Sequence, residues 1–358
     1  MNEKKWVIIT QEKKVIEIKK KSFNLYGLFF KLMTILCGIL LIGYSIKKRL
    51  LKNFFYFKPI LNKSPPKNKI PEANNLKIAL CTMGKKENLY AKEYIEYYVN
   101  LGVDHIFIYD DNEPNTERIS DVLDNKYRNH VTIYENIKDK IKLQSDAFTT
   151  CYHNNKAKYD WFIMVDMDEF VYVINDTLKD YLVDKKFDEC DFIKFHWVTS
   201  TDNNLVHYDP RPLFERFTGP FLKEKFIKSM IRGNISELKY WVHSPYYSPV
   251  RNTTCNNIGE KLNYKAFSFE SINDANFDKA FILHFRYKST EEFINKFKRG
   301  YSYWFGNKIK WFLSGNIETY FERNNITLEK INYVEKELKI NLFKIRLKYY
   351  LLKIFYLL

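Results

Sequence analysis

The feature that most constrains this chain is a run of apolar residues, Trp161 to Val165, that leads directly into three acids. The length and apolar character of the run predict a buried strand. Asp166, Asp168 and Glu169 follow at the carboxyl end of that strand, where open α/β sheets bind their ligands. Carboxylate oxygens suit Mg²⁺ or Mn²⁺, whose other ligands are often water and substrate phosphates. The pattern therefore predicts a clamp for a metal ion and a diphosphate, and an acidic turn is the alternative.

Predicted strands and helices alternate ahead of this run. We expect strands over residues 76–82, 104–109 and 130–134, and helices over residues 87–100, 117–123 and 142–156. Such alternation is typical of βαβ units around a parallel sheet, so the predicted fold class is α/β. The later part is less regular, with strands expected over 192–197, 225–231, 240–245 and 280–285 and a helix over 289–299.

The first 75 residues predict a membrane attachment. Residues 25–46 carry one charge, Lys31, and their 22 residues are enough to span a bilayer core. A basic tail, residues 1–24, precedes this segment, and a stem containing several prolines, residues 47–75, follows it. We therefore expect an uncleaved transmembrane anchor, with a buried core helix as the alternative. Because both flanks are basic, the positive charges leave the orientation of the anchor open.

The rest of the chain divides into a main domain, residues 76–300, and a helical extension, residues 301–358. The extension ends in an apolar and basic stretch from Lys339, which fits a packed helix, the simpler interpretation, or a helix on a membrane surface. The chain has 58 Lys and Arg against 43 Asp and Glu, a net charge of +15. This excess favours an anionic membrane or substrate. Without a base-reading helix or an RNP-like strand, no nucleic-acid partner is expected.

Five cysteines leave the redox state of the chain open. They form no Cys-x-x-Cys motif, so a structural zinc site is not expected. Cys37 lies in the apolar segment. Two interpretations stand for the other four, which are disulfides in an oxidising compartment and buried thiols in a reducing one. These four are Cys81, Cys151, Cys190 and Cys255.

Six blocks in the same order make this chain resemble glycosyltransferase family 92. The blocks are residues 87–98; 101–105 with 108–110; Gln144, Ala147 and Cys151; Trp161 with 166–170; 228–229 with 242–245; and 284–293 with 299–300. Together they cover about residues 76–300. The chain departs from the family pattern at Lys86, where the family commonly has Asn, and at Glu113-Pro114, which interrupts the usual turn after Asp110. These departures affect fine substrate contacts and not the class.

The resemblance implies a GT-A fold, in which a Rossmann-like nucleotide half joins an acceptor half. It implies an inverting transferase that moves a hexose, often galactose, from a UDP-sugar to the hydroxyl of a glycan, glycoprotein or glycolipid acceptor. It also implies a divalent cation, Mn²⁺ or Mg²⁺, as cofactor. With the anchor, we expect a lumenal type II enzyme of a Golgi-like compartment. A bacterial enzyme on the cytosolic face of the inner membrane is the alternative.

Candidate site residues follow from position and chemistry. As metal ligands we predict the two acids of the clamp and a histidine in a turn: Asp166, Asp168 and His243. His284 is the alternative histidine ligand. Nucleotide-binding candidates are acids after the second strand and on the third helix, and basic residues that neutralise phosphate: Asp110, Asp111, Asp146, Lys228 and Arg286, with Arg299 as a further basic candidate. The base must lie in the acceptor half, and two acids that follow strands are preferred: Asp202 and Glu237.

Two other classes of protein fit parts of the pattern. A nucleotidyltransferase also uses an acid cluster, but usually with a glycine-rich or basic phosphate loop, and this chain has only 11 glycines and no Walker motif. A non-catalytic, membrane-anchored glycan-binding protein would keep the fold without the clamp. Donor sugar, acceptor and linkage stay open.

Overall fold

The computed structural model describes residues 54–55, 75–137, 141, 143–247, 253–262, 275–299 and 309–356. The chain forms two compact units, Met1–Phe54 and Phe55–Leu358. The two-residue strand β1 (Phe54–Phe55) marks their boundary. The predicted anchor, residues 25–46, lies outside the described residues, and within them no helix has the length and apolar character to cross a bilayer.

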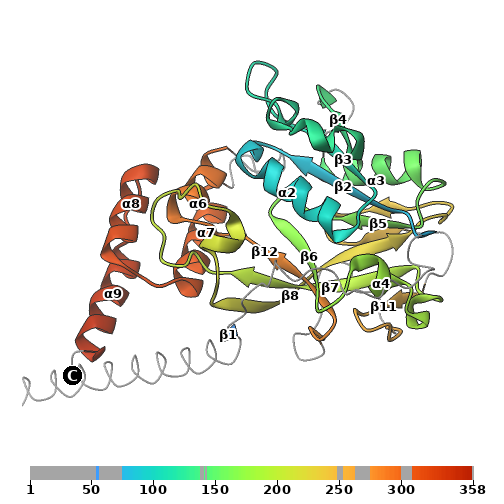
Figure 1. The fold of residues 1–358 in the computed structure, drawn as a ribbon. Helices are drawn as coiled ribbons and strands as arrows, with labels where there is room; N and C mark the ends of the chain where they lie inside the picture. The colour runs from blue at the N-terminus through green and yellow to red at the C-terminus, as the bar shows by residue number, and fades with distance from the viewer. Residues whose placement is uncertain are drawn as a thin grey trace, which may run out of the picture. The chain divides into compact units, whose positions relative to one another are not determined.

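A mixed sheet forms the centre of the second unit (Figure 1), with its strands in the order β4-β3-β2-β5-β8-β7-β12-β6 and β11 beside β7. A separate ribbon joins β9 and β10. The strands are β2 (Ile78–Gly84), β3 (His105–Asp110), β4 (Val131–Tyr134), β5 (Trp161–Met164), β6 (Glu169–Val173), β7 (Phe192–Ser200), β8 (Phe221–Arg232), β9 (Lys239–Tyr240), β10 (Pro245–Tyr247), β11 (Thr254–Cys255) and β12 (Ala280–His284).

Because of the strand directions, most strands have their carboxyl ends at the same edge of the sheet. β4, β3, β2 and β5 are parallel, β8 runs antiparallel to both β5 and β7, and β12 is parallel to β7. β6 is antiparallel to β12, so its first residue, Glu169, lies opposite His284 at the same edge. The predicted α/β class is confirmed. The parallel sheet is confirmed for the first four strands in the sheet order, whereas the later strands are mixed.

The helices and short 3₁₀ turns connect and cover these strands. The α-helices are α2 (Asn88–Leu101), α3 (Gln144–Asn155), α4 (Leu178–Leu182), α5 (Leu213–Arg216), α6 (Thr290–Lys298), α7 (Ile309–Arg323), α8 (Leu328–Leu338) and α9 (Phe343–Tyr356). The 3₁₀ turns are η2 (Ile119–Val122), η3 (Asn125–His130) and η5 (Lys185–Phe187). The helix expected over residues 117–123 is therefore a short 3₁₀ turn.

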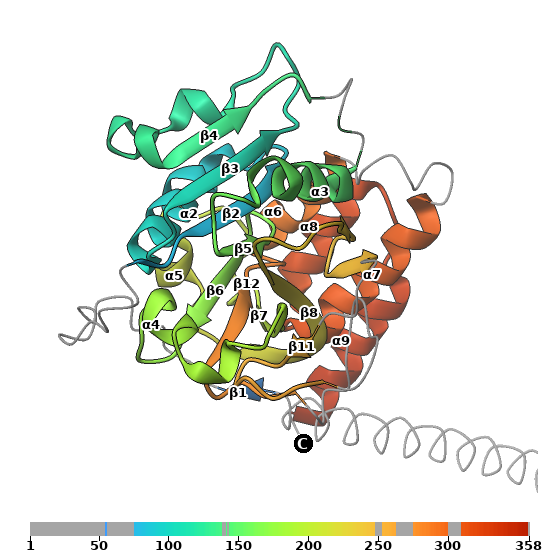
Figure 2. The same cartoon turned by 90° about the vertical axis from the view of Figure 1, so that its right-hand side faces the viewer.

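Two hydrophobic cores lie on opposite faces of the sheet, as Figure 2 shows for α2 and α3. Side chains of successive strand residues point to opposite faces. Leu80 and Ile163 accordingly pack with α2, whereas Cys81 and Met164 pack with α3. Strands that are covered on both faces read as continuous apolar runs. This is why the run before the acids shows no alternation of polar and apolar residues.

A third core joins α6, α7 and α8. It contains Phe293 of α6, Tyr320 of α7 and Ile331 of α8, all of which are buried. Part of the extension thus shares a core with the last helix of the predicted main domain.

Disulfides join elements that are distant in the sequence. Cys81 of β2 is bonded to Cys151 of α3, and Cys190, before β7, is bonded to Cys255 of β11. The bonded residues are 70 and 65 positions apart, so each bridge constrains a long loop of the unfolded chain. Cys37 lies outside the described residues.

Candidate functional site

The three acids lie in a tight turn between β5 and β6, which we call the acid turn (residues 165–169). The backbone N–H of Asp166 donates to Glu169 Oε2 at 2.9 Å, and the N–H of Glu169 donates to the Asp166 carbonyl oxygen at 3.1 Å. The hydroxyl of Tyr98 on α2 donates to the Glu169 carbonyl oxygen at 2.8 Å. β5 ends at Met164, and the chain turns at residues 167 and 168, between Asp166 and Glu169. The Asp166 side chain is 33% exposed, whereas that of Asp168 is 5% exposed.

Two lysines from distant elements pair with the acid turn. Lys228 of β8 is buried, and its Nζ lies 3.0 Å from Asp166 Oδ1 and 3.3 Å from Glu169 Oε2. Lys296 of α6 lies 2.5 Å from Asp168 Oδ2. Gln144, the first residue of α3, also donates to Asp166 Oδ1. Both aspartates are therefore balanced by ammonium groups, and Glu169 shares one of these.

Burial and neighbouring charges separate the pKa values of these groups. Burial, together with the charge of Asp166, raises the pKa of Glu169 to about 8. Its Oε1 atom is buried and has no hydrogen-bond partner among the described residues. Burial also disfavours ionised Asp168, but Lys296 and His284 hold its pKa well below the usual range. Burial opposes the charge on Lys228, but Asp166 and Glu169 raise its pKa. At pH 7 Glu169 is therefore mainly protonated, whereas Asp168 is ionised.

A second charged group gathers beside Asp168. Glu87, just before α2, accepts from Arg299 at 2.6 Å, and Lys288 lies 3.2 Å from its other oxygen. Although burial opposes it, these two cations lower the pKa of Glu87. Lys85 lies 3.4 Å from Asp111 at the neighbouring strand ends. Counting Lys296, four cationic side chains therefore come from the β2 and α6 regions, and we call this set the basic cluster: Lys85, Lys288, Lys296 and Arg299.

Sequence reasoning missed three of these four residues, because it considered only Arg299. Lys288 and Lys296 lie about 120 positions after the acid turn, and only the fold brings α6 to it. A usable signal was present for Lys85 and Glu87, because both directly follow a predicted strand whose carboxyl end must share the edge with the acids.

His243, predicted as a metal ligand, is near the acid turn. Lys228 donates to the carbonyl oxygen of Val242, the preceding residue, at 2.7 Å. His243 Nδ1 lies 3.1 Å from the Ile227 carbonyl oxygen. Burial and the charge of Lys228 lower the pKa of His243 to about 4, so its imidazole is neutral at pH 7. Between His243 and His284 lies Trp197, with ring centroids 5.3 and 4.3 Å away. Metal ligation by His243 stays a prediction.

The carboxylates predicted to bind nucleotide make local contacts. Asp110 accepts from the N–H groups of Asn112 at 2.8 Å and Ile119 at 2.9 Å, and it is buried. Asp146 accepts from the Leu143 N–H at 3.0 Å at the start of α3. These are the contacts of carboxylates that cap a turn or the start of a helix. A role in nucleotide binding is untested for both residues.

Arg286 follows β12 and turns toward the helical extension. Its Nη2 atom donates to Asn316 of α7 at 3.3 Å, and its guanidinium lies 5.7 Å from the ring centre of Tyr287. Phosphate binding by Arg286 stays a prediction, whereas Lys228 of β8 contacts the acid turn directly.

The positions of the two acids that we predicted as the base do not favour that role. The Asp202 carboxylate is buried, lies 2.6 Å from Lys330 Nζ and accepts from the Tyr320 hydroxyl at 2.5 Å. Glu237 is exposed and follows the end of β8, where Arg232 pairs with Trp161 at the sheet edge opposite the acid turn. Both assignments stay predictions, but the surroundings of Asp202 and the location of Glu237 are arguments against them.

The acid turn fits a divalent cation whose ligands are shared between protein and substrate. No three His, Cys, Asp or Glu side chains in the described residues lie close enough to hold a metal by themselves. Mg²⁺ and Mn²⁺ sites of phosphate-handling enzymes often use one or two carboxylates and complete their coordination with water and phosphate. Asp166 is sufficiently exposed for this, and Asp168 is ionised beside it.

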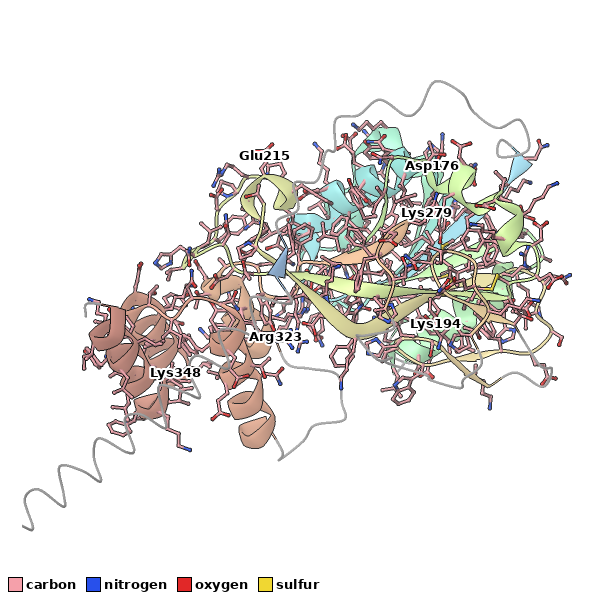
Figure 3. The ribbon with its side chains drawn as sticks, turned by 90° about the horizontal axis from the view of Figure 1, so that it is seen from below. Asp176, Lys194, Glu215, Lys279, Arg323 and Lys348 are labelled. Atoms are coloured by element: carbon pink, nitrogen blue, oxygen red, sulfur yellow. A yellow bond between two sulfur atoms is a disulfide. The ribbon has the colours of Figure 1, made fainter. Side chains whose placement is uncertain are left out.

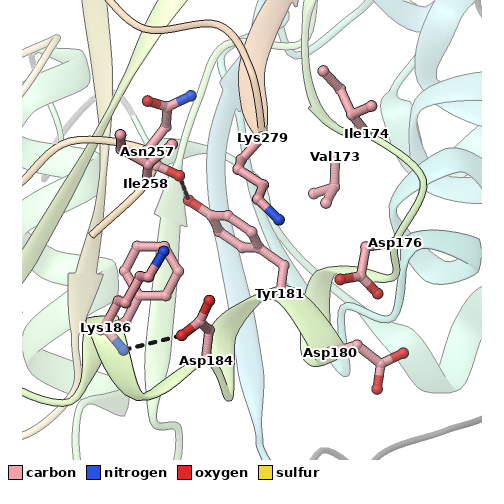
Figure 4. A pocket seen from close by; sticks show the side chains of 11 residues that line it. Val173, Ile174, Asp176, Asp180, Tyr181, Asp184, Lys186, Asn257, Ile258 and Lys279 are labelled. Atoms are coloured by element: carbon pink, nitrogen blue, oxygen red, sulfur yellow. Dashed lines mark hydrogen bonds between the residues drawn. The ribbon is translucent and has the colours of Figure 1, made fainter. Parts of the chain in front are cut away.

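A separate cavity of about 240 Å³ lies at the carboxyl end of β6, away from the acid turn (Figure 4). It is lined by charged and polar side chains that include Asp184, Lys186 and Lys279. Tyr181 points across it to the Asn257 carbonyl oxygen, to which its hydroxyl donates at 2.7 Å. None of the predicted site residues lines this cavity.

Comparison with known proteins gives the same family that the ordered blocks indicate. A glycosyltransferase family 92 protein of Oryza sativa subsp. japonica is 28% identical over 118 residues, which are 31% of this chain and 20% of that protein. One from Ricinus communis is 26% identical over 96 residues, which are 27% of this chain and 17% of that protein. This chain therefore spans about a fifth of these relatives or less. The solved structure of HddC from Yersinia pseudotuberculosis aligns with a TM-score of 0.31 at 12% identity, covering 51% of this chain and 89% of that one, which is too distant to inform the fold.

The family model for glycosyltransferase family 92 matches residues 75–310, about two thirds of the chain. The matched region contains the acid turn, Lys228 and the basic cluster. It supports a glycosyltransferase enzyme over a nucleotidyltransferase or a non-catalytic glycan-binding protein. This chain belongs to glycosyltransferase family 92.

Proposed function

We propose that this protein is an inverting glycosyltransferase of the GT-A type that transfers a hexose, with galactose the first candidate, from a UDP-sugar to a glycan hydroxyl. The observation that carries the proposal is the acid turn at the carboxyl end of β5, in which half-buried Asp166 pairs with buried Lys228. Two aspartates beside cationic side chains suit a nucleotide diphosphate and its counter-cation.

The reaction is a single in-line displacement. The acceptor hydroxyl oxygen forms a bond to the anomeric carbon as the bond from that carbon to the diphosphate oxygen breaks. The hydroxyl proton passes to a base, and the diphosphate leaves with an added negative charge. The basic cluster, residues 85, 288, 296 and 299, is where this charge would be stabilised.

Asp166 and Asp168 would hold Mn²⁺ or Mg²⁺. When bound, the cation would act as a Lewis acid that neutralises the diphosphate. Lys228 would keep the Asp166 side chain oriented, because it contacts both that carboxylate and Glu169. His243, which is neutral at pH 7, would be a further nitrogen ligand that suits Mn²⁺ better than Mg²⁺.

We also propose a lumenal type II arrangement with residues 25–46 as the anchor. The pairs Cys81–Cys151 and Cys190–Cys255 support an oxidising compartment, where disulfides persist. The alternative, a bacterial enzyme on the cytosolic face, would keep these thiols reduced. The two arrangements are distinguished by alkylating the protein without reductant and analysing it by mass spectrometry. Alkylation of the four cysteines of these two pairs would contradict the lumenal arrangement.

The test of the activity is a donor screen with the full-length chain in detergent. A panel of UDP-sugars is incubated with Mn²⁺, with Mg²⁺ or with chelator, and UDP release and glycan products are measured. We expect one UDP-sugar to be consumed, and chelator to abolish this.

Two variants accompany the screen. Asp166→Asn should lower turnover by roughly 10²–10³-fold, while Glu189→Gln, a change at an exposed acid outside the site, should not alter it. Turnover that survives both chelator and Asp166→Asn would contradict the proposed role of the acid turn.

A further inference from the structure

The last helix, α9, packs through only one of its two apolar faces. Ile345 and Tyr349 lie against the third core, and Arg346 bonds to Glu335 and Asn332 of α8. These contacts define the inner face of α9. They match the packed-helix interpretation of the sequence, but they use only part of the apolar residues in the helix.

The outer face of α9 carries an exposed apolar stripe. Phe343, Leu347, Tyr350 and Ile354 are 66, 48, 47 and 51% exposed. Their spacing of four, three and four residues places them on one side of a helix, over a length of about 16 Å. Six of the nine large apolar side chains left exposed among the described residues lie between Ile340 and Ile354. An exposed apolar cluster of this kind indicates an interaction surface.

Basic side chains border this stripe on both sides. From the helical spacing, Lys344 and Lys348 lie along one border, and Lys353 lies along the other, on the same side as Arg346, which is paired with Glu335. Figure 3 labels Lys348 on this helix. The sequence of α9, Phe343–Tyr356, contains no acid. Lysine stems can extend along apolar surface and place their ammonium groups at the level of lipid phosphates.

We propose that α9 docks on an anionic lipid bilayer surface, with the stripe Phe343, Leu347, Tyr350 and Ile354 immersed among the acyl chains near the headgroups. Apolar residues on one side of a helix, flanked by cations and free of acids, are the pattern of interfacial helices. The charge on the borders complements anionic headgroups. This contact is separate from the predicted anchor, and it would hold the catalytic domain against the membrane.

The test uses the full-length chain reconstituted into vesicles of phosphatidylcholine, with or without phosphatidylserine. An environment-sensitive fluorophore is attached at Leu347→Cys in a Cys37→Ser background. A matched label at Lys336→Cys reports an exposed position of α8. We expect the label at 347 to shift to the blue when phosphatidylserine is present, and the label at 336 to stay unchanged.

Charge variants test the proposed partner. Each basic residue near an anionic surface favours the docked state roughly fivefold, so Lys344→Ala with Lys348→Ala should lower the ratio of docked to undocked protein by roughly 20- to 30-fold. The control pair Lys126→Ala and Lys261→Ala removes the same charge from exposed positions elsewhere and should keep the blue shift.

Two results would overturn the proposal. One is a label at 347 that stays in a water-like environment in both kinds of vesicle. The other is a blue shift that is equal in both kinds of vesicle and grows with the ratio of protein to lipid, because it would identify a second copy of the chain as the occupant. Circular dichroism of the charge variants excludes unfolding as the cause of a lost shift.

Discussion

Two buried lysines pair with aspartates in this protein, and their surroundings differ. Lys228 lies 3.0 Å from Asp166 in the acid turn, and Lys330 lies 2.6 Å from Asp202 between β7 and α8. Both lysines are almost completely buried, but a third of the Asp166 side chain is exposed, against 1% for Asp202. In the second pair, the Tyr320 hydroxyl and the Asn204 N–H also bond to the carboxylate.

The comparison separates an ion pair that holds a structure together from one that retains capacity to bind. Around Asp202 the contacts to Lys330, Tyr320 and Asn204 leave the carboxylate with hydrogen-bonding partners on both oxygens. In the acid turn, Lys228 is shared between Asp166 and Glu169, and one Glu169 oxygen has no partner among the described residues. The acids of the acid turn share one lysine and are partly exposed to solvent. They are therefore the better candidate for a site that binds charged ligands.

The largest effect is expected when the fully buried ion pair of Asp202 and Lys330 is broken. Asp202→Ala would leave the Lys330 ammonium buried without its carboxylate, at a cost of about 3–5 kcal/mol in the free energy of unfolding. Urea titration followed by circular dichroism measures this. Asp202→Leu combined with Lys330→Met should recover much of the loss, because no uncompensated charge is then buried. Unchanged stability with lost transfer would instead restore Asp202 as a candidate base.

The second-largest effect is expected for Asp166, the partly exposed aspartate of the acid turn. Asp166→Ala should lower the rate of sugar transfer by roughly 10²–10³-fold, since it removes a proposed ligand where charge develops. The thermal midpoint should change little because the side chain is partly in water. Transfer kinetics and a melting curve on the same preparation check both statements. A fall in transfer explained by loss of folded protein would contradict the difference drawn between the two pairs.

A smaller effect is expected from the coupling inside the acid turn. Lys228→Met removes the ammonium group that Asp166 and Glu169 share, while Glu169→Gln replaces one of the two carboxyl groups that contact this ammonium. We expect the double variant to be more stable than the sum of the single changes by roughly 1–3 kcal/mol. Unfolding free energies of the four proteins give this coupling. Strict additivity would show that Lys228 and Glu169 act independently.

The smallest effect is expected for an exposed ion pair, which serves as the reference for both buried pairs. Lys261 and Glu189 contact each other with side chains 60% and 74% exposed. Lys261→Ala should leave the unfolding midpoint within experimental error, because water and salt screen such pairs. A clear destabilisation would show that distance alone, and not burial, governs these contacts.

The sequence predicted more of the first half of the fold than of the second. The strands that became β2, β3, β4 and β5 were predicted because apolar runs that are buried on both faces are distinct without knowledge of their neighbours. β8 was predicted as 225–231 but spans Phe221–Arg232, since its first part contains three consecutive charged residues, 223–225, and pairs with β7 only in the folded sheet. The helix expected at 117–123 became a 3₁₀ turn tied to Asp110.

By itself, the sequence determined the α/β class, the acid turn and the family, because each rests on the local order of residues. Only the tertiary structure brought Lys228 and Lys296 to the acid turn from 62 and 128 positions away, paired the four cysteines and placed Asp202 in a sealed ion pair. It also left one face of α9 packed and the other exposed, where the sequence pattern fitted both environments. The physical reason is that burial and pairing depend on neighbours that are distant along the chain, whereas periodicity and motif order do not.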